Sequence, residues 1–304
     1  MPLSILQRGL TMNNIDASAS HRLWILAVLL SAIVTACSSS VSPPGGAGVD
    51  YQTAKVMFKQ GNLDRALSLT DNMASADSNS PDALKARVLR AVIYSARIDA
   101  YRELADTYQK GSQIATKAQS VTSFNRHRAN DMQYGSEAAL NLGEAVMKFT
   151  SKPDFPREVT LDVPWPSVEG PQQIDALSRI GRGIWVPEDT QESAGVEAQQ
   201  KALDDVLVEL IGGDRSKAKA AIEAGPAQIS GLDFALFLEK NMVDGLELFG
   251  PKYLASPGQS KTLCDVADRL ATPIAAMLKE KPDKAKEANY KKLQDRIKDA
   301  KKFT

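Results

Sequence analysis

The chain of 304 residues has little cysteine and little histidine, with two of each. Two cysteines exclude a disulfide-rich scaffold and a cysteine-rich metal site, and two histidines leave little for a zinc or iron centre. Basic and acidic side chains balance at 37 each, so the sequence also lacks the excess of positive charge that binding to nucleic-acid phosphates requires. We therefore expect no metal, no cofactor and no nucleic-acid partner.

The first part of the chain contains an apolar run of twelve residues, 23–34, which follows His21 and Arg22. Twelve residues of helix span about 18 Å, well short of the roughly 30 Å of a bilayer's hydrocarbon core. A basic flank, a short apolar run and small residues after it are typical of a secretory signal peptide. We predict a signal peptide over residues 1–36. A short membrane anchor is the alternative.

The end of this segment reads Val34-Thr35-Ala36-Cys37, an aliphatic residue and two small residues before a cysteine. It resembles the lipobox of bacterial lipoproteins. The resemblance implies cleavage before Cys37 and acylation of that cysteine, and Ser38 in the next position implies the outer membrane, facing the periplasm. Residues 37–49 are rich in serine, proline and glycine and are expected to form a flexible tether. An ordinary signal peptide with an incidental cysteine is the alternative.

Residues 50–150 have the apolar spacing of helices, as in Tyr51, Ala54 and Phe58, which share one helical face. Gly61-Asn62 interrupts the first helix, and Ser80-Pro81 is a typical helix start. Nowhere does the sequence alternate with a period of two for long enough to predict a strand. The sequence therefore predicts an all-α fold.

Residues 50–81 resemble one tetratricopeptide repeat. The matching residues are Ala54 in the first helix, the stretch 59–66 across the turn, and Pro81 near the end. The following unit, residues 82–118, keeps the length and the apolar stripe. The resemblance implies tetratricopeptide-like antiparallel helix pairs whose concave surface binds a protein or peptide. A generic antiparallel bundle gives the same periodicity and is the alternative.

Residues 151–187 differ in composition, with six of the fifteen prolines and two of the three tryptophans, Trp165 and Trp185. Residues that precede proline avoid the helical region, so the stretch 163–166 is expected to be extended. Its Val, Leu and Trp residues indicate a Pro/Trp-rich insertion that packs across the helices. Helices are expected to resume over residues 188–304, a C-terminal helical region whose last 26 residues hold ten basic and five acidic side chains.

Aromatic and basic residues are the candidates for binding. Three tyrosines recur every seven residues and would align on one helix, and a cluster of two arginines and a histidine is suited to an anion. Core packing explains the tyrosines and Trp165 equally well, and exposure to solvent explains the basic cluster. The possible binding surface comprises Tyr101, Tyr108, Arg126, His127, Arg128 and Trp165.

No nucleophile–base pair or metal constellation stands out, and Cys264 lies on an apolar stripe, where a buried, inert thiol is expected. We therefore expect a non-enzymatic, membrane-anchored lipoprotein that acts as a protein-interaction scaffold or an envelope assembly component. The alternative is a periplasmic helical lipoprotein that binds a small ligand and assists a transporter. Such a protein needs an enclosed pocket, lined here by Tyr101, Tyr108 and Trp165.

Overall fold

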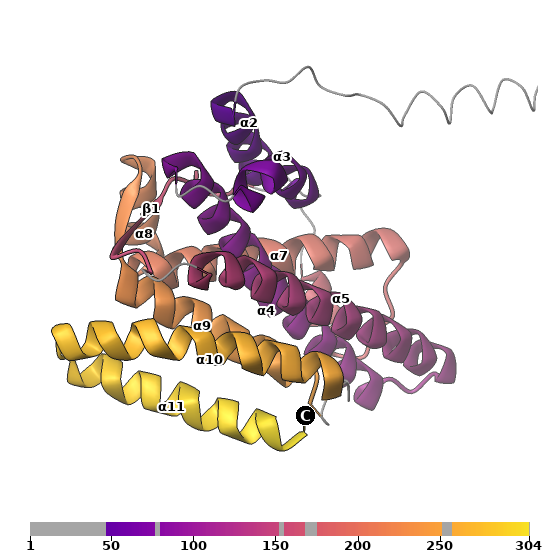
Figure 1. Ribbon diagram of the computed structural model, residues 1–304. Coiled ribbons are helices and arrows are strands. Elements are labelled where there is room, and N and C mark those ends of the chain that lie inside the picture. The colour runs from indigo at the N-terminus through magenta and orange to yellow at the C-terminus, as the bar shows by residue number, and fades with distance from the viewer. Residues whose placement is uncertain (1–46, 77–79, 152–154, 168–174, 251–256, 304) are drawn as a thin grey trace, which may run out of the picture. The chain divides into compact units, whose positions relative to one another are not determined.

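The computed structural model describes residues 47–76, 80–151, 155–167, 175–250 and 257–303, all within one compact unit. Cys37 and the predicted signal peptide lie outside the described residues. The chain is mostly helical, as predicted (Figure 1). The elements are α2 (Ala47–Lys59), α3 (Leu63–Ser75), α4 (Pro81–Ile114), α5 (Ala118–Thr150), β1 (Glu158–Leu161), α6 (Ala176–Gly181), α7 (Glu188–Ile211), α8 (Arg215–Glu223), β2 (Ala227–Ser230), α9 (Gly231–Glu247), α10 (Pro257–Glu280), α11 (Lys284–Ala300) and the short 3-10 helix η1 (Lys301–Phe303).

Helices α2 and α3 form a hairpin at the predicted turn. Gly61 adopts a φ of 77°, which glycine tolerates without steric cost. The Asn62 side chain accepts a hydrogen bond from the Arg65 amide at 3.3 Å and so caps α3. Phe58 and Leu63 on either side of the turn are buried. The local sequence thus determines this helix pair.

Helices α4 and α5 are much longer, with 34 and 33 residues. The unit expected over residues 82–118 is therefore mainly one continuous helix and not a pair of short ones. The Ser80 hydroxyl caps α4 by accepting a hydrogen bond from the Ala83 amide. Opposite residues of the antiparallel pair meet at close range, as do Tyr101 and Tyr134 near the middle. Helix α4 also contacts α3, α6, α7 and α9.

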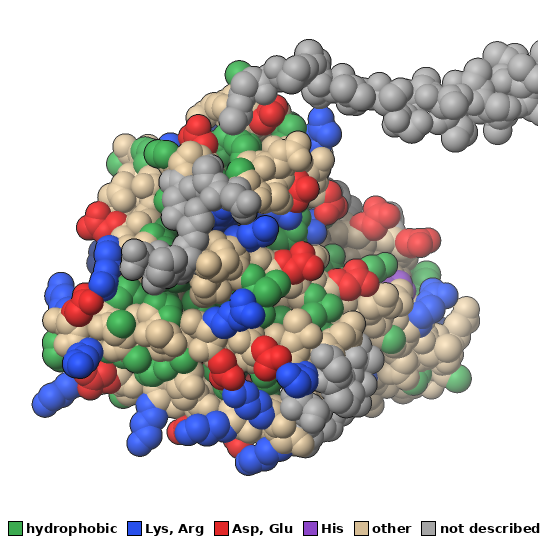
Figure 2. All heavy atoms as spheres, in the orientation of Figure 1, with side chains coloured by type: hydrophobic (Ala, Val, Ile, Leu, Met, Phe, Trp, Pro, Cys, Tyr) green, Lys and Arg blue, Asp and Glu red, His purple; other side chains and the backbone are tan. Residues whose placement is uncertain are grey.

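Helix α9 is the most enclosed helix among those described, with 13 of its 17 residues buried. A helix that is surrounded on all sides is expected to be apolar around its circumference. The buried Asp244 is paired: its Oδ1 lies 2.7 Å from Arg296 of α11, and its Oδ2 lies 3.2 Å from Lys240. Lysine and arginine side chains gather on the outer surface of the α10–α11 hairpin (Figure 2). A partly buried ion pair between Arg296 and Asp244 thus joins the basic terminal helix to α9.

The expectation of no strand is wrong in detail. Strands β1 and β2 form a two-stranded antiparallel sheet in which Val159 is opposite Ile229. The Gly231 amide donates a 2.6 Å hydrogen bond to the Arg157 carbonyl at the end of the ladder. A Cβ on Gly231 would lie 2.0 Å from the carbonyl oxygen of Pro156, so only glycine fits there. Each strand has only four residues, too few for a pattern of period two to be recognised.

The part of the Pro/Trp-rich insertion that runs from β1 to Trp165 packs into the core, whereas Trp185 of the same insertion is exposed. The apolar side chains of the first part are buried at every second position from β1 onward: Val159, Leu161, Val163 and Trp165. This is the alternation of a strand, continued beyond β1 through an extended segment. The insertion therefore contributes to the core and supplies one wall of the pocket that follows.

Candidate functional site

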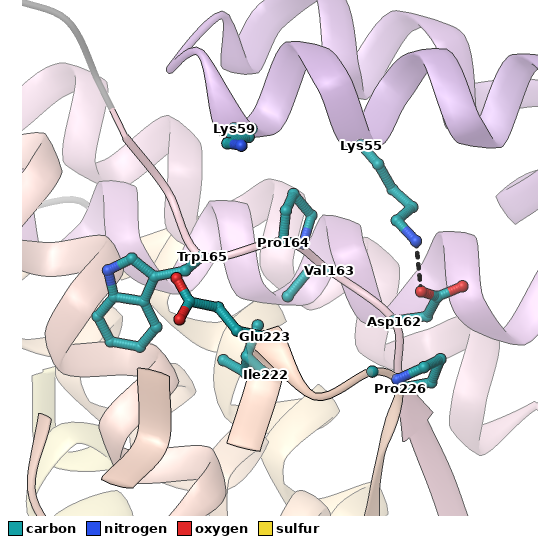
Figure 3. Close-up of a pocket in the computed structure, with 10 residues that line it drawn as sticks. Lys55, Lys59, Asp162, Val163, Pro164, Trp165, Ile222, Glu223 and Pro226 are labelled. Atoms are coloured by element: carbon teal, nitrogen blue, oxygen red, sulfur yellow. Dashed lines mark hydrogen bonds and ion pairs between the residues drawn. The ribbon is translucent and has the colours of Figure 1, made fainter. Parts of the chain in front are cut away.

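A pocket of about 300 Å³ opens where three separate parts of the chain meet (Figure 3). One part is α2, another is the extended segment after β1, and the third is the end of α8 with the turn that follows it. We name this site the α2–α8 pocket. Its lining residues are Lys55, Lys59, Asp162, Val163, Pro164, Trp165, Ile222, Glu223, Gly225 and Pro226.

The segment after β1 is held against α2 by hydrogen bonds at both ends. The Tyr51 hydroxyl donates to the carbonyl oxygen of Asp162 at 2.9 Å, and the Ser167 amide donates to the carbonyl oxygen of Lys59 at 2.8 Å. Pro164 and Pro166 keep the residues before them extended. The floor of the pocket is thus fixed by the local sequence and by contacts more than a hundred residues apart in the chain.

Charges in the pocket are distributed unevenly. The Asp162 side chain is only 9% exposed, and its two oxygens lie 2.5 Å from Lys55 Nζ and 3.5 Å from Lys85 Nζ. Glu223 lies 3.8 Å from Lys219. Lys59 is exposed and has no ion-pair partner among the described residues. The pocket therefore combines a neutralised carboxylate in its floor with an unpaired cation at its rim.

Trp165 lines this pocket, yet the residue is only 7% exposed. This residue therefore belongs to the core, and the part of it that stays accessible faces the pocket. The apolar lining is completed by two prolines and Ile222. No tyrosine lines the pocket, so the enclosed site expected from Tyr101, Tyr108 and Trp165 together is not present in the described part of the chain.

The two predicted tyrosines lie instead between α4 and α5. The ring of Tyr108 stacks on His127 with 5.2 Å between centroids, and the ring of Tyr101 is 5.6 Å from that of Tyr134. Tyr108 is buried and Tyr101 is half-buried. Burial raises the pKa of both phenols, and it raises the pKa of nearby Asp131 to about 7. These tyrosines therefore serve mainly to pack the two long helices together.

The three residues of the basic cluster lie at successive positions of α5 and differ in their exposure. Arg126 is exposed, whereas His127 and Arg128 are half-buried. Burial, reinforced by the charge of Arg126, lowers the pKa of His127 and so favours its neutral form. Three successive helical positions point in different directions, which is why the cluster does not form one anion site.

A second pocket, of about 350 Å³, lies between α4 and α7 and is mostly charged. Two of its ion pairs are close: Lys201 Nζ is 2.6 Å from Glu103, and Arg102 is 2.7 Å from Asp99. The Glu103 hydrogen bond raises the pKa of Lys201, and burial raises that of Asp99. Because these charges neutralise one another within the protein, we regard this pocket as a weaker candidate.

Glu239 is a strongly perturbed carboxyl group on α9, where it is fully buried. Its Oε1 accepts a 2.5 Å hydrogen bond from Gln294, its Oε2 has no partner within the described residues, and burial raises its pKa to about 8. No pocket opens onto it among those described. Its pKa shift is thus a property of the core, with consequences for stability.

We expect replacement of Glu239 by glutamine to make the protein less sensitive to rising pH. The folded state holds a proton that the unfolded chain releases above its ordinary pKa of 4.5, so the wild type loses stability between about pH 4.5 and about pH 8. Glutamine keeps the acceptor for Gln294 and has no proton to lose. Urea unfolding should show the variant to be more stable than the wild type at pH 8, by at most about 4 kcal/mol.

The two proteins should converge below pH 4.5. The matched control is Glu144→Gln on the exposed face of α5, which should follow the wild type throughout. A constant difference between Glu239→Gln and the wild type at every pH would contradict the assignment.

Cys264 is buried, as predicted, and burial raises the pKa of its thiol. Within the described ranges, no group of three or more His, Cys, Asp or Glu side chains is placed to hold a metal ion. The same part of the chain contains no helix with the length and apolar character needed to cross a membrane.

Sequence reasoning missed Lys55, Lys59 and Asp162 as site residues. Asp162 lies 107 positions from Lys55, and neither residue belongs to a local motif. Only the tertiary fold brings them together. The alternating apolar residues from Val159 to Trp165 were the one available signal that this segment would be fixed in place.

Comparison of the chain with models of protein families, with curated proteins and with solved structures gives no match.

Proposed function

We propose that this protein is a non-enzymatic, lipid-anchored scaffold of the bacterial cell envelope and that it binds another protein at the α2–α8 pocket. The observation that carries the proposal is the pocket itself, which is open, built by three segments and provided with an unpaired cation. Acylation of Cys37 at the outer membrane, with the body in the periplasm, is the part of the proposal that rests on the lipobox. The tetratricopeptide-like character is assigned to the α2–α3 hairpin, which forms one side of the pocket.

The lining of the pocket suits a segment of a partner protein. Trp165, Pro164 and Pro226 offer rigid apolar surface, which loses little conformational entropy on binding. The carboxylate of Asp162 is already satisfied by Lys55 and Lys85, so it does not call for a cation from a ligand. The exposed ammonium of Lys59 is the cation that a partner can pair, and the exposed carboxylate of Glu223 lies at the same pocket, 3.8 Å from Lys219. We infer an apolar side chain followed by a carboxylate as the element recognised.

Reversal of the charge at Lys59 tests this proposal. Lys59→Glu should reduce recovery of the partner from crosslinked cell envelopes about tenfold, because a repulsive charge at the rim lowers both the association rate and the affinity. Lys291→Glu, at an exposed position of α11, is the matched control and should leave recovery unchanged. Thermal unfolding of both variants should match that of the wild type. Equal recovery with all three proteins would exclude the pocket as the binding site.

A small ligand is the second candidate, favoured by the volume of about 300 Å³, which lies at the lower end of the range for small-molecule sites. Its open form and the separation of Trp165 from the tyrosines favour the protein partner. Native mass spectrometry distinguishes the two, since a small non-protein adduct that Lys59→Glu removes would support the ligand.

A further inference from the structure

Three large apolar side chains are exposed together at one end of the α4–α5 hairpin. Ile114, the last residue of α4, is 57% exposed. Ile184 and Trp185, in the segment between α6 and α7, are 42% and 50% exposed. Single exposed apolar residues are ordinary, but three at one place indicate a contact surface.

Close backbone packing brings these residues together. Gly183, with a φ of 76°, lies so near the end of α4 that a Cβ on it would be 2.9 Å from the Ala115 nitrogen. One turn earlier in α4, a Cβ on Gly111 would be 2.2 Å from the carbonyl oxygen of Ile180 in α6. The segment that carries Ile184 and Trp185 is therefore held against the last turn of α4, where Ile114 lies.

Positive charge predominates around these side chains, and the acidic residues that flank Ile184 and Trp185 in the sequence are Asp175 and Glu188. Residues 107–130 and 176–187 contain six lysines and arginines and no aspartate or glutamate. Among the six, Lys117, Arg126 and Arg179 are exposed and have no ion-pair partner among the described residues. Arg182 is paired at 3.2 Å with Asp175, which lies just outside the second segment.

We propose that this surface docks on a bilayer that contains anionic phospholipid. We name it the hairpin-end surface, made of Ile114, Lys117, Arg126, Arg179, Ile184 and Trp185. A tryptophan beside aliphatic side chains is suited to the boundary between headgroups and acyl chains. Cations around them are attracted by anionic lipid headgroups. The combination fits a lipid surface better than a small anion, which has no use for the apolar residues.

The hairpin-end surface is separate from the α2–α8 pocket. Docking there relies on the proposed lipid anchor only to keep the folded body near the bilayer. Cys37 and Ala47, the first residue of α2, are ten positions apart, and an extended chain over that interval spans at most about 35 Å. An anchored body therefore stays close to the bilayer. Docking through the hairpin-end surface would fix its orientation there.

An environment-sensitive fluorophore on the full chain tests the contact. Thr116 is exposed next to Lys117, so Thr116→Cys carries an NBD label beside the surface, with Cys37→Ser and Cys264→Ser as background so that no other thiol takes the label. With vesicles of phosphatidylglycerol and phosphatidylcholine, the emission should shift to the blue, as in apolar surroundings. With pure phosphatidylcholine it should not. The emission of the same label at Ser216→Cys on α8 should not shift with either kind of vesicle.

Charge removal and flotation complete the test. The triple variant Lys117→Gln, Arg126→Gln, Arg179→Gln should lower the affinity of the labelled surface for anionic vesicles about a hundredfold. A matched triple variant of Lys284, Lys291 and Lys292 to glutamine on α11 should not. Flotation of the chain that keeps Cys37 with neutral vesicles reports the anchor alone. A failure of the anchor leaves the label result valid, because the labelled chain lacks Cys37. A label that stays in water on anionic vesicles, or that shifts equally on neutral ones, would overturn the proposal.

Discussion

Replacing Cys37 with serine is expected to abolish incorporation of a fatty acid into this protein. Serine has no thiol for acylation, and residues 38–49 after it carry no apolar run that would replace the lost chains. One acyl chain binds a membrane only marginally, whereas several make attachment effectively permanent. Metabolic labelling with an alkyne fatty acid should therefore mark the wild type strongly and the variant not at all. A chain from which the predicted signal peptide has been cleaved should also leave the membrane fraction.

Cys264→Ser is the control for this experiment, because Cys264 is the other cysteine and is buried in α10. It should keep the label and stay in the membrane fraction. Label on Cys37→Ser would refute the lipobox assignment, and so would its loss from Cys264→Ser. The apparent mass of each product separates a processed chain from one that retains its apolar leader.

Gly111→Ala is expected to lower the free energy of unfolding by roughly 2 kcal/mol. The new methyl group would lie 2.2 Å from the carbonyl oxygen of Ile180 and 3.3 Å from the ring of Phe124. A backbone oxygen cannot rotate away, so α6 must move from α4. The displacement of α6 costs about 3 kcal/mol, which exceeds the gain of about 1 kcal/mol that alanine brings to a helix interior.

Gly195→Ala is the matched control, since Gly195 also lies within a helix but has open space where its Cβ would be. It should raise stability by up to about 1 kcal/mol. Urea denaturation of both variants measures the difference. Equal stabilisation by the two substitutions would show that α6 does not pack on α4 as described, and the hairpin-end surface would then lose its basis.

Much of the fold could be predicted because its determinants are local. Gly61-Asn62 ends one helix and caps the next, and Ser80-Pro81 starts α4, as their residue types indicate. The length of α4 was harder to predict, because the spacing of its apolar residues fits two short helices as well as one long helix. The short sheet was missed because its strands pair across about 70 residues, and four residues show little periodicity.

The site was less predictable than the fold. Trp165 was identified as a candidate from its proline-rich surroundings, and it does line the α2–α8 pocket. Its expected companions Tyr101 and Tyr108 do not line this pocket, since they lie in the α4–α5 contact. Lys59 carries no distinguishing feature in the sequence. Its importance arises only from the absence of a counter-charge among its described neighbours, a property of the tertiary structure.

Photo-crosslinking in intact cells tests the proposed scaffold function most directly. A benzoylphenylalanine at position 59, on the rim of the α2–α8 pocket, should give one discrete protein adduct. The same residue at position 291, exposed on α11, should not give that adduct. If position 59 yields no adduct, or if both positions yield the same ones, the pocket does not bind a partner protein and the account is wrong.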